Sequence, residues 1–150
     1  MLSKLQALLA TIGGLLRNPL LLVIRLYWGW QFFIDGKGKL QNLDRVASYF
    51  ASLNIPMPRA NAIAVASVQC VFGLLLLAGL FTRIAALVLM GVMCVAYATA
   101  ERAALGAIFT DSDKFVSAAP FLFLFASAIA FAFGPGKLSL DAALGRDTKT

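Results

Sequence analysis

Long stretches without a formal charge dominate the pattern of hydrophobic and polar positions along this chain. Three such stretches hold 23, 17 and 22 residues, and they cover residues 60–82, 84–100 and 115–136. A helix of about 20 apolar residues, rising about 1.5 Å per residue, crosses the ~30 Å hydrocarbon core of a bilayer. The pattern therefore predicts membrane-spanning helices over residues 60–81, 84–102 and 116–133.

A further span is predicted over residues 18–35, where the apolar run is less uniform. Pro19 suits the first turn of a helix, because its missing N–H group would have no partner there in any case. Arg25 interrupts the run and lies near the predicted mid-depth of this span. The charges and glycines from Asp35 to Lys39 predict where the span ends.

Two amphipathic helices are predicted outside the spans. In residues 3–16, apolar side chains recur every three or four positions, at Leu5, Leu8, Leu9, Ile12, Leu15 and Leu16. We interpret this segment as a helix in the headgroup region rather than a signal peptide, because Gly13, Gly14 and Arg17 precede any cleavage site. A frayed terminus is the alternative. The second helix ends before Pro56, and its apolar residues share one face, namely Leu43, Val46, Phe50 and Leu53. It is expected at the membrane surface.

Together these elements predict an all-α integral membrane four-helix bundle, with residues 1–150 as a single domain. Only Thr82 and Arg83 separate the second and third spans, so these helices are expected to be antiparallel neighbours. Four spans place both termini on one side of the membrane. The two sides carry equal numbers of Lys and Arg when Arg146 and Lys149 are counted. The basic residues tight to the spans favour cytoplasmic termini, namely Arg17, Arg83 and Lys137.

Composition agrees with a membrane protein and narrows its chemistry. Hydrophobic residues make up 61% of the chain and charged residues 13%, whereas soluble domains carry about 25% charged residues. The net charge is +6, but the basic residues form no patch interleaved with aromatic residues. Membrane lipids are therefore the expected partners, and nucleic acid is not. Because the chain has no histidine, neither a metal centre nor a haem is expected.

Arg25 is the strongest local signal for a site. An arginine within a span is costly and usually faces protein or a water-filled cavity. One interpretation makes it an anchor for an anion or a quinone headgroup, with Trp28 one turn further along the helix. The other makes it a structural hub that bonds Gln69, Tyr97, a serine or backbone carbonyls. The candidate ligand-binding residues are thus Arg25, Trp28, Gln69 and Tyr97.

A second candidate site is a polar mouth at the ends of the first and third spans. Asp35, Lys39 and Glu101 lie at the same predicted membrane face, from which a mouth would lead towards Arg25. The simpler interpretation is favoured, because charged residues at span ends ordinarily mark the water boundary.

Cys70 and Cys94 are each 12 residues from Thr82 along antiparallel helices, so they are expected at similar depth. We expect structural thiols rather than a redox pair, because free cysteine is a common small buried residue.

Several short motifs follow one another in order along residues 18–142. They are Arg25, Gly36-Lys37-Gly38-Lys39, Leu53-Asn54-Ile55-Pro56, the end of the second span over residues 73–83, and Gly134-Pro135-Gly136-Lys137-Leu138-Ser139-Leu140-Asp141. Together they resemble the DoxX family of small bacterial membrane proteins, which includes the DoxD-type subunit of thiosulfate–quinone oxidoreductase. The resemblance implies a four-helix protein of the bacterial inner membrane. Members often carry Glu where this chain has Gln69, and an amide is able to accept a hydrogen bond from Arg25 but cannot titrate.

Two classes of function remain open. The first is a membrane subunit of an oxidoreductase system linked to the quinone pool, with quinone as the candidate cofactor and a soluble or membrane redox partner. The second is a non-enzymatic assembly or transporter-like subunit whose partners carry the chemistry, and it is supported by the shortage of catalytic groups. A homo-oligomer is compatible with both classes, because thin helices rich in small residues leave surface for packing.

Overall fold

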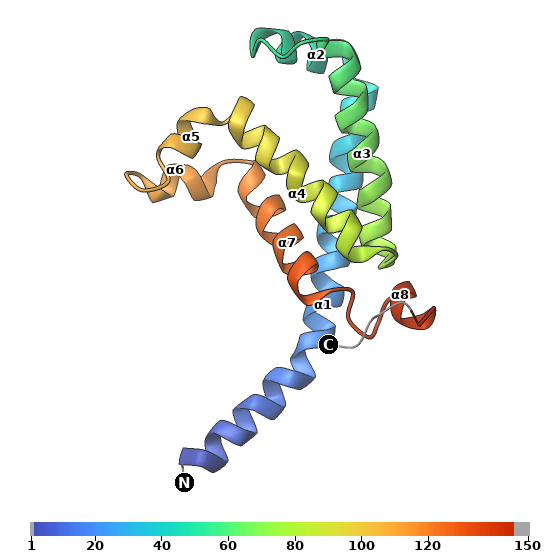
Figure 1. Ribbon diagram of the computed structural model, residues 1–150, viewed down its shortest axis with the longest axis vertical. Coiled ribbons are helices and arrows are strands. Elements are labelled where there is room, and N and C mark those ends of the chain that lie inside the picture. The colour runs from blue at the N-terminus through green and yellow to red at the C-terminus, as the bar shows by residue number, and fades with distance from the viewer. Residues whose placement is uncertain (1, 146–150) are drawn as a thin grey trace.

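A computed structural model of the chain describes residues 2–145, and its regular elements are all helices (Figure 1). In chain order they are α1 (Leu2–Gln41), α2 (Leu43–Ser52), α3 (Pro58–Ala78), α4 (Thr82–Thr99), α5 (Arg102–Gly106), α6 (Ser112–Ser117), α7 (Pro120–Phe133) and α8 (Leu140–Ala143). The predicted all-α class is confirmed. Within residues 2–145, three helices are long and apolar enough to cross a bilayer, namely α1, α3 and α4.

The first helix is longer than the sequence pattern predicts. We expected a surface helix over residues 3–16 and a separate span over 18–35, but α1 continues for 40 residues through Pro19 and past Asp35. Gly36 does not end the helix because it serves as a packing position. A Cβ atom there would lie 2.7 Å from the carbonyl oxygen of Ala66 and 2.8 Å from the backbone nitrogen of Cys70. The contact with α3 thus keeps the helix in place beyond the predicted boundary.

The N-terminal part of α1 projects away from the other helices (Figure 1). It presents a row of exposed apolar side chains with no neighbouring helix, and their exposed fractions lie between 44% and 72% at Leu5, Leu8, Leu9, Ile12, Leu15 and Leu16. At about 1.5 Å per residue, a 40-residue helix is about 60 Å long, twice the thickness of the hydrocarbon core.

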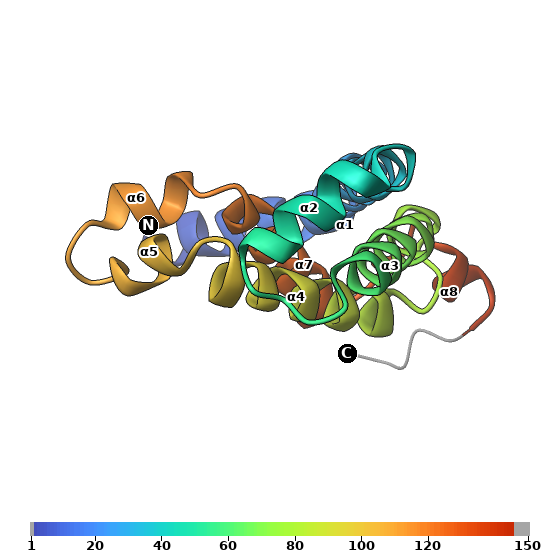
Figure 2. The same ribbon diagram turned by 90° about the horizontal axis from the view of Figure 1, so that it is seen from above.

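Close packing of α1 on α3 organises the fold. The two helices run antiparallel along most of the length of α3 (Figures 1 and 2). Glycines allow the approach: a Cβ atom at Gly29 would lie 2.6 Å from the backbone nitrogen of Leu77, and one at Gly73 would lie 2.8 Å from that of Phe33. Gly29 and Gly73 thus let the two helices approach closely, as small residues do between helices in lipid.

The helices α4 and α7 complete the body of the protein. α4 packs against α7 and, after the short turn, against α3, while α7 reaches α1. A compact apolar core forms where these helices meet, and its fully buried residues are Phe32, Leu76, Ala85, Ala86, Leu89 and Ala130.

α7 is shorter than the predicted fourth span. Residues 116–133 were expected to form one helix, but Ala118 is extended, with φ −63° and ψ 139°, and separates α6 from α7. Pro120 then occupies the first turn of α7, where its missing N–H group costs no hydrogen bond. The resulting 14-residue helix is only about 21 Å long. The helix α4 also ends earlier than the span predicted over residues 84–102, since its last residue is Thr99.

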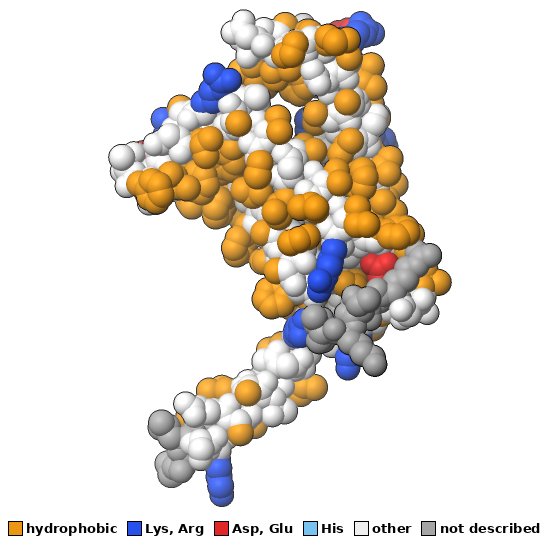
Figure 3. Space-filling view, in the orientation of Figure 1, with side chains coloured by type: hydrophobic (Ala, Val, Ile, Leu, Met, Phe, Trp, Pro, Cys, Tyr) orange, Lys and Arg blue, Asp and Glu red, His pale blue; other side chains and the backbone are white. Residues whose placement is uncertain are grey.

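The two ends of the molecule differ in their elements. The α3–α4 turn, the segment after α7 and helix α8 lie at one end, which we call the turn end (Figure 1). Lys and Arg side chains are visible at this end and also near α2 and the end of α4, and apolar side chains cover much of the remaining surface in this view (Figure 3). α2 and the C-terminal end of α4 lie at the opposite end (Figure 1). Arg146 and Lys149, used in the charge count, lie outside the described residues.

Candidate functional site

Arg25 is held by the chain segment that follows α7. Its side chain is 2% exposed, its Nη1 group donates to the carbonyl oxygen of Pro135, and its Nη2 group donates to that of Leu138 at 2.8 Å. Gly79 leaves room for the guanidinium, because a Cβ atom there would lie 2.7 Å from the Cζ atom of Arg25. The prediction that Arg25 bonds backbone carbonyls is confirmed, whereas the predicted partners Gln69 and Tyr97 form hydrogen bonds with other residues.

The structure also corrects the predicted depth of Arg25. The residue lies beside Gly79, which caps α3, and beside the loop after α7, rather than midway along these helices. The prediction was wrong because it placed the end of the first span at Asp35, whereas α1 continues to Gln41. Arg25 thus lies at the turn end of the helices.

Asp141 fixes the same segment to the start of α4. Its Oδ1 atom accepts from the backbone N–H of Phe81 at 2.9 Å. Its Oδ2 atom accepts from the N–H of Thr82 at 2.9 Å and from the Thr82 hydroxyl at 3.1 Å. The backbone N–H of Asp141 in turn donates to the carbonyl of Gly79 at 2.9 Å. A carboxylate at a helix N-terminus also meets the positive end of the helix dipole. Arg25 and Asp141 therefore tie residues 135–141 to three helices.

Replacing Asp141 with alanine is expected to lower the free energy of unfolding by about 2 kcal/mol. The reason is that three donors at the start of α4 lose one shared, buried acceptor. Thermal unfolding of the purified protein in a mild detergent measures the effect. Asp44→Ala is the control, because the Asp44 side chain is 88% exposed and its partner Arg59 is also exposed. Equal melting temperatures for the two variants would contradict this role of Asp141.

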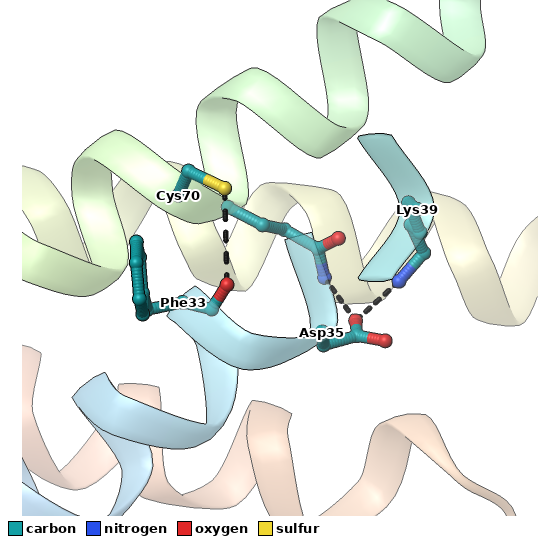
Figure 4. A network of polar contacts seen from close by, with 5 residues as sticks. Phe33, Asp35, Lys39 and Cys70 are labelled. Carbon is teal, nitrogen blue, oxygen red and sulfur yellow. Dashed lines mark hydrogen bonds and ion pairs between the residues drawn. The ribbon is translucent and has the colours of Figure 1, made fainter. Parts of the chain in front are cut away.

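A second polar cluster lies near the midpoint of α3. Gln69 is 1% exposed, and its Nε2 group donates to Oδ2 of Asp35 at 2.8 Å. The Nζ group of Lys39 donates to the same carboxylate oxygen, so two donors converge on it (Figure 4). The side chains of Asp35 and Lys39 are 41% and 25% exposed. The Oε1 atom of Gln69 is buried and has no hydrogen-bond partner.

The cluster revises the predicted polar mouth. Asp35 and Lys39 do come together, but they face the middle of α3 through Gln69 instead of marking the end of a span. Within residues 2–145, no hydrogen bond or ion pair joins Glu101 to either of them. Arg25 and Asp35 are ten residues apart on one helix, or about 15 Å along its axis, so the two polar groups are separate.

Tyr97 lies at the other end of α4 and serves a different contact. Its hydroxyl donates to the carbonyl oxygen of Phe115 at 2.8 Å, and its ring stacks on the Phe115 ring with centroids 4.9 Å apart. It therefore joins α4 to the segment before α7 and does not reach Arg25.

Trp28 borders an apolar groove between α1 and α7. The groove has a volume of about 140 Å³, is open on one side, and is lined by Ile24, Trp28, Leu122, Phe125, Ala126 and Ile129. The Trp28 ring meets the Phe123 ring edge to face, with centroids 5.0 Å apart. Phe125 is 56% exposed, so part of the aromatic wall is open to the surroundings.

The groove and the two polar groups share one face of α1. Neighbours along one side of a helix are three or four positions apart in sequence. The residues of this face follow that spacing, and they are Arg25, Trp28, Phe32, Asp35 and Lys39. We call this row the α1 stripe. Two helical turns, or about 10 Å, separate Trp28 from Asp35.

The two cysteines do not meet. Cys70 approaches the carbonyl oxygen of Phe33 on α1 with its Sγ atom at 3.7 Å (Figure 4). Cys94 is exposed. Both are free thiols.

The family model named DoxX matches residues 20–102 of this chain. The chain belongs to the DoxX family. The resemblance seen in the sequence is thereby confirmed, and so is the expectation of a membrane protein with apolar helices. The matched range of this DoxX protein contains Arg25, Asp35, Lys39 and Gln69, whereas Asp141 lies beyond it. Searches of curated proteins and of solved structures gave no match to the chain.

Sequence reasoning missed Asp141 as a structural residue and Gln69 as the partner of Asp35. Asp141 is the last residue of a motif that supported the family resemblance, but its target, the start of α4, lies 59 residues earlier in the chain. In the part of this DoxX protein that the structure describes, no group of three or more His, Cys, Asp or Glu side chains gathers as a metal site would require.

Proposed function

We propose that this DoxX protein is a membrane subunit of an oxidoreductase system that exchanges electrons with the quinone pool of the bacterial inner membrane. The observation that carries the proposal is the groove beside Trp28. Its wall is apolar and partly aromatic, and it opens on one side. A quinone has a flat ring on an apolar tail, so such a surface suits its entry from lipid. A soluble or membrane redox protein would supply or receive the electrons.

The proposed arrangement in the membrane has four spans. α3 and α4 match the thickness of the hydrocarbon core, α7 lies beside them, and part of α1 forms the fourth span. Residues 3–16 and α2 would lie at membrane surfaces, because their apolar side chains need cover. α2 packs against α3, and its half-buried apolar face, with the residue that follows it, comprises Leu43, Val46, Phe50 and Leu53. Both termini would be cytoplasmic.

One observation favours a different class, an assembly or transporter-like subunit without chemistry of its own. Both Nη groups of Arg25 bind backbone carbonyls, so the arginine stabilises the fold in this structure. The two classes predict different purified material. A quinone-linked subunit co-purifies with quinone, and quinone reduction in membrane vesicles depends on the chain. An assembly subunit purifies with a stable partner and no bound quinone.

Binding of quinone is expected to quench the fluorescence of Trp28. The chain has two tryptophans, and Trp30 is 50% exposed and contacts Phe33 rather than the groove. Titration of the protein in lipid nanodiscs with decylubiquinone should quench the wild type and the Trp30→Phe variant with a saturable curve. The Trp28→Phe variant should show only weak quenching that does not saturate. Equal quenching of the two single-tryptophan variants would contradict the groove as the entry site.

A further inference from the structure

We propose that Gln69, Asp35 and Lys39 form a hydrogen-bonding site for the hydroxyl group of a neutral ring, and that it prefers the reduced quinol to the oxidised quinone. The choice of ring rests on the proposed function above. The site itself rests on a buried acceptor that the chain leaves unpaired, the Oε1 atom of Gln69.

The orientation of the Gln69 amide determines which of its atoms lacks a hydrogen-bond partner. An ionised carboxylate only accepts hydrogen bonds, so the group that faces Asp35 must be the NH₂ end of the amide. Turning the amide over would place two acceptors against each other. The Oε1 atom therefore stays on the opposite side, where it is buried and needs a donor.

The charges of the cluster favour a ligand without net charge. Asp35 and Lys39 form an ion pair, so they neutralise each other beside Gln69. The Lys39 ammonium has three donors and uses one of them on Asp35, which leaves two for another acceptor. A hydroxyl group suits this environment, because it donates to the amide oxygen through its hydrogen and accepts from an ammonium through its oxygen.

Access to the cluster is consistent with a ligand from the bilayer. Asp35 and Lys39 are partly exposed, so the cluster is not sealed inside the protein. It lies two helical turns from Trp28 on the α1 stripe, about 10 Å away. Phe32, which lies between Trp28 and Asp35 on this stripe, is fully buried in the core, so a ring would approach the cluster from the partly exposed side at Asp35 and Lys39 rather than along the stripe.

The missing donor makes the site selective for redox state. A quinone presents carbonyl oxygens, which only accept hydrogen bonds and leave the Oε1 atom of Gln69 unpaired. A quinol presents hydroxyl groups, one of which satisfies that atom. We expect decylubiquinol to bind about three- to tenfold more tightly than decylubiquinone, the ratio that one net hydrogen bond provides.

The test compares both forms of the ligand on the full chain in lipid nanodiscs, with the quinol kept reduced under argon. Wild type should prefer decylubiquinol, and Gln69→Met, of similar size but without the acceptor, should bind both forms equally. Cys70→Ser is the matched control, because Cys70 is the next residue on α3 and its thiol points to Phe33 instead of the cluster. This control should keep the preference. Lys39→Met, which keeps Gln69, should weaken binding of both forms and serves as a second variant if Gln69→Met does not fold.

The outcomes separate this proposal from the proposed function. If wild type binds both forms equally, or if Gln69→Met retains the preference, the proposed site is wrong while quinone binding at the groove stands. If wild type binds neither form, the proposed function fails, and the site fails with it.

Discussion

Membranes that express the Arg25→Leu variant are expected to contain little folded protein. The leucine cannot donate to the carbonyl oxygens of Pro135 and Leu138, so both lose their partner. Asp141 is buried nearby, and its charge would lose the compensating guanidinium. A hydrogen bond to a charged group contributes about 1.5–3 kcal/mol, so the loss of two such bonds removes a large part of the stability of a small domain. The measurement is the yield of monodisperse protein after extraction in detergent, with the melting temperature of whatever is recovered.

A matched control keeps this result interpretable. Arg59 is also an arginine, but its side chain is 69% exposed and pairs only with the exposed Asp44. The Arg59→Leu variant should therefore match wild type in yield and melting temperature. Arg25→Gln keeps some donors but loses the charge, so it should fall between wild type and Arg25→Leu. Normal yield and stability of Arg25→Leu would show that the guanidinium does not hold the C-terminal segment.

The second large effect is expected at the contact between α1 and α3. In the Gly29→Val variant, the added Cβ atom would lie 2.6 Å from the backbone nitrogen of Leu77, and backbone cannot turn aside as a flexible side chain does. The two helices must move apart, which we expect to lower the free energy of unfolding by about 3 kcal/mol or more. Thermal unfolding in detergent measures the loss of stability.

Gly91 provides the control for this prediction. It lies within α4, it is exposed, and nothing stands within 4 Å of a Cβ atom added there. Gly91→Ala should leave stability unchanged or raise it slightly, because alanine favours a helix by about 1 kcal/mol over glycine. If Gly29→Val unfolds at the temperature of Gly91→Ala, the close approach of α1 and α3 is not important for stability.

Much of the fold follows from short-range patterns. The charge-free stretches predict α3 and α4, because length and hydropathy alone decide whether a helix matches a bilayer. The ordered motifs indicate the DoxX family, and the family model confirms it. The helical nature of residues 3–16 and 43–52 also follows from their apolar spacing.

The boundaries of α1 could not be predicted, because long-range packing overrides the local signal. Glycines and charges after Asp35 ordinarily end a span, yet Gly36 remains helical against the backbone of α3. Because α1 is longer than predicted, both the position of Arg25 along the helices and the role of Asp35 differ from the prediction. Once α1 is extended, Arg25 lies at the turn end and Asp35 faces the midpoint of α3.

The hydrogen-bond partners of Arg25 and Gln69 also could not be predicted from the neighbouring sequence. Gln69 donates to a residue 34 positions earlier, and Arg25 donates to carbonyls more than 100 positions later. Backbone carbonyls carry no sequence signature, because every residue has one. The sequence identified Arg25 and Gln69 as unusual polar residues within apolar segments, and only the fold shows that they belong to two separate groups.

Photolabelling with an azidoquinone tests whether quinone binds at the groove beside Trp28 and at the Asp35 cluster. The full chain in lipid nanodiscs is irradiated with the label and digested, and the labelled peptides are identified by mass spectrometry. We expect adducts on residues 24–39 of α1 and residues 122–129 of α7, with loss of labelling when excess decylubiquinol is present. Labelling confined to the exposed residues 3–16, or labelling that excess quinol does not reduce, would show that quinone does not bind at these sites.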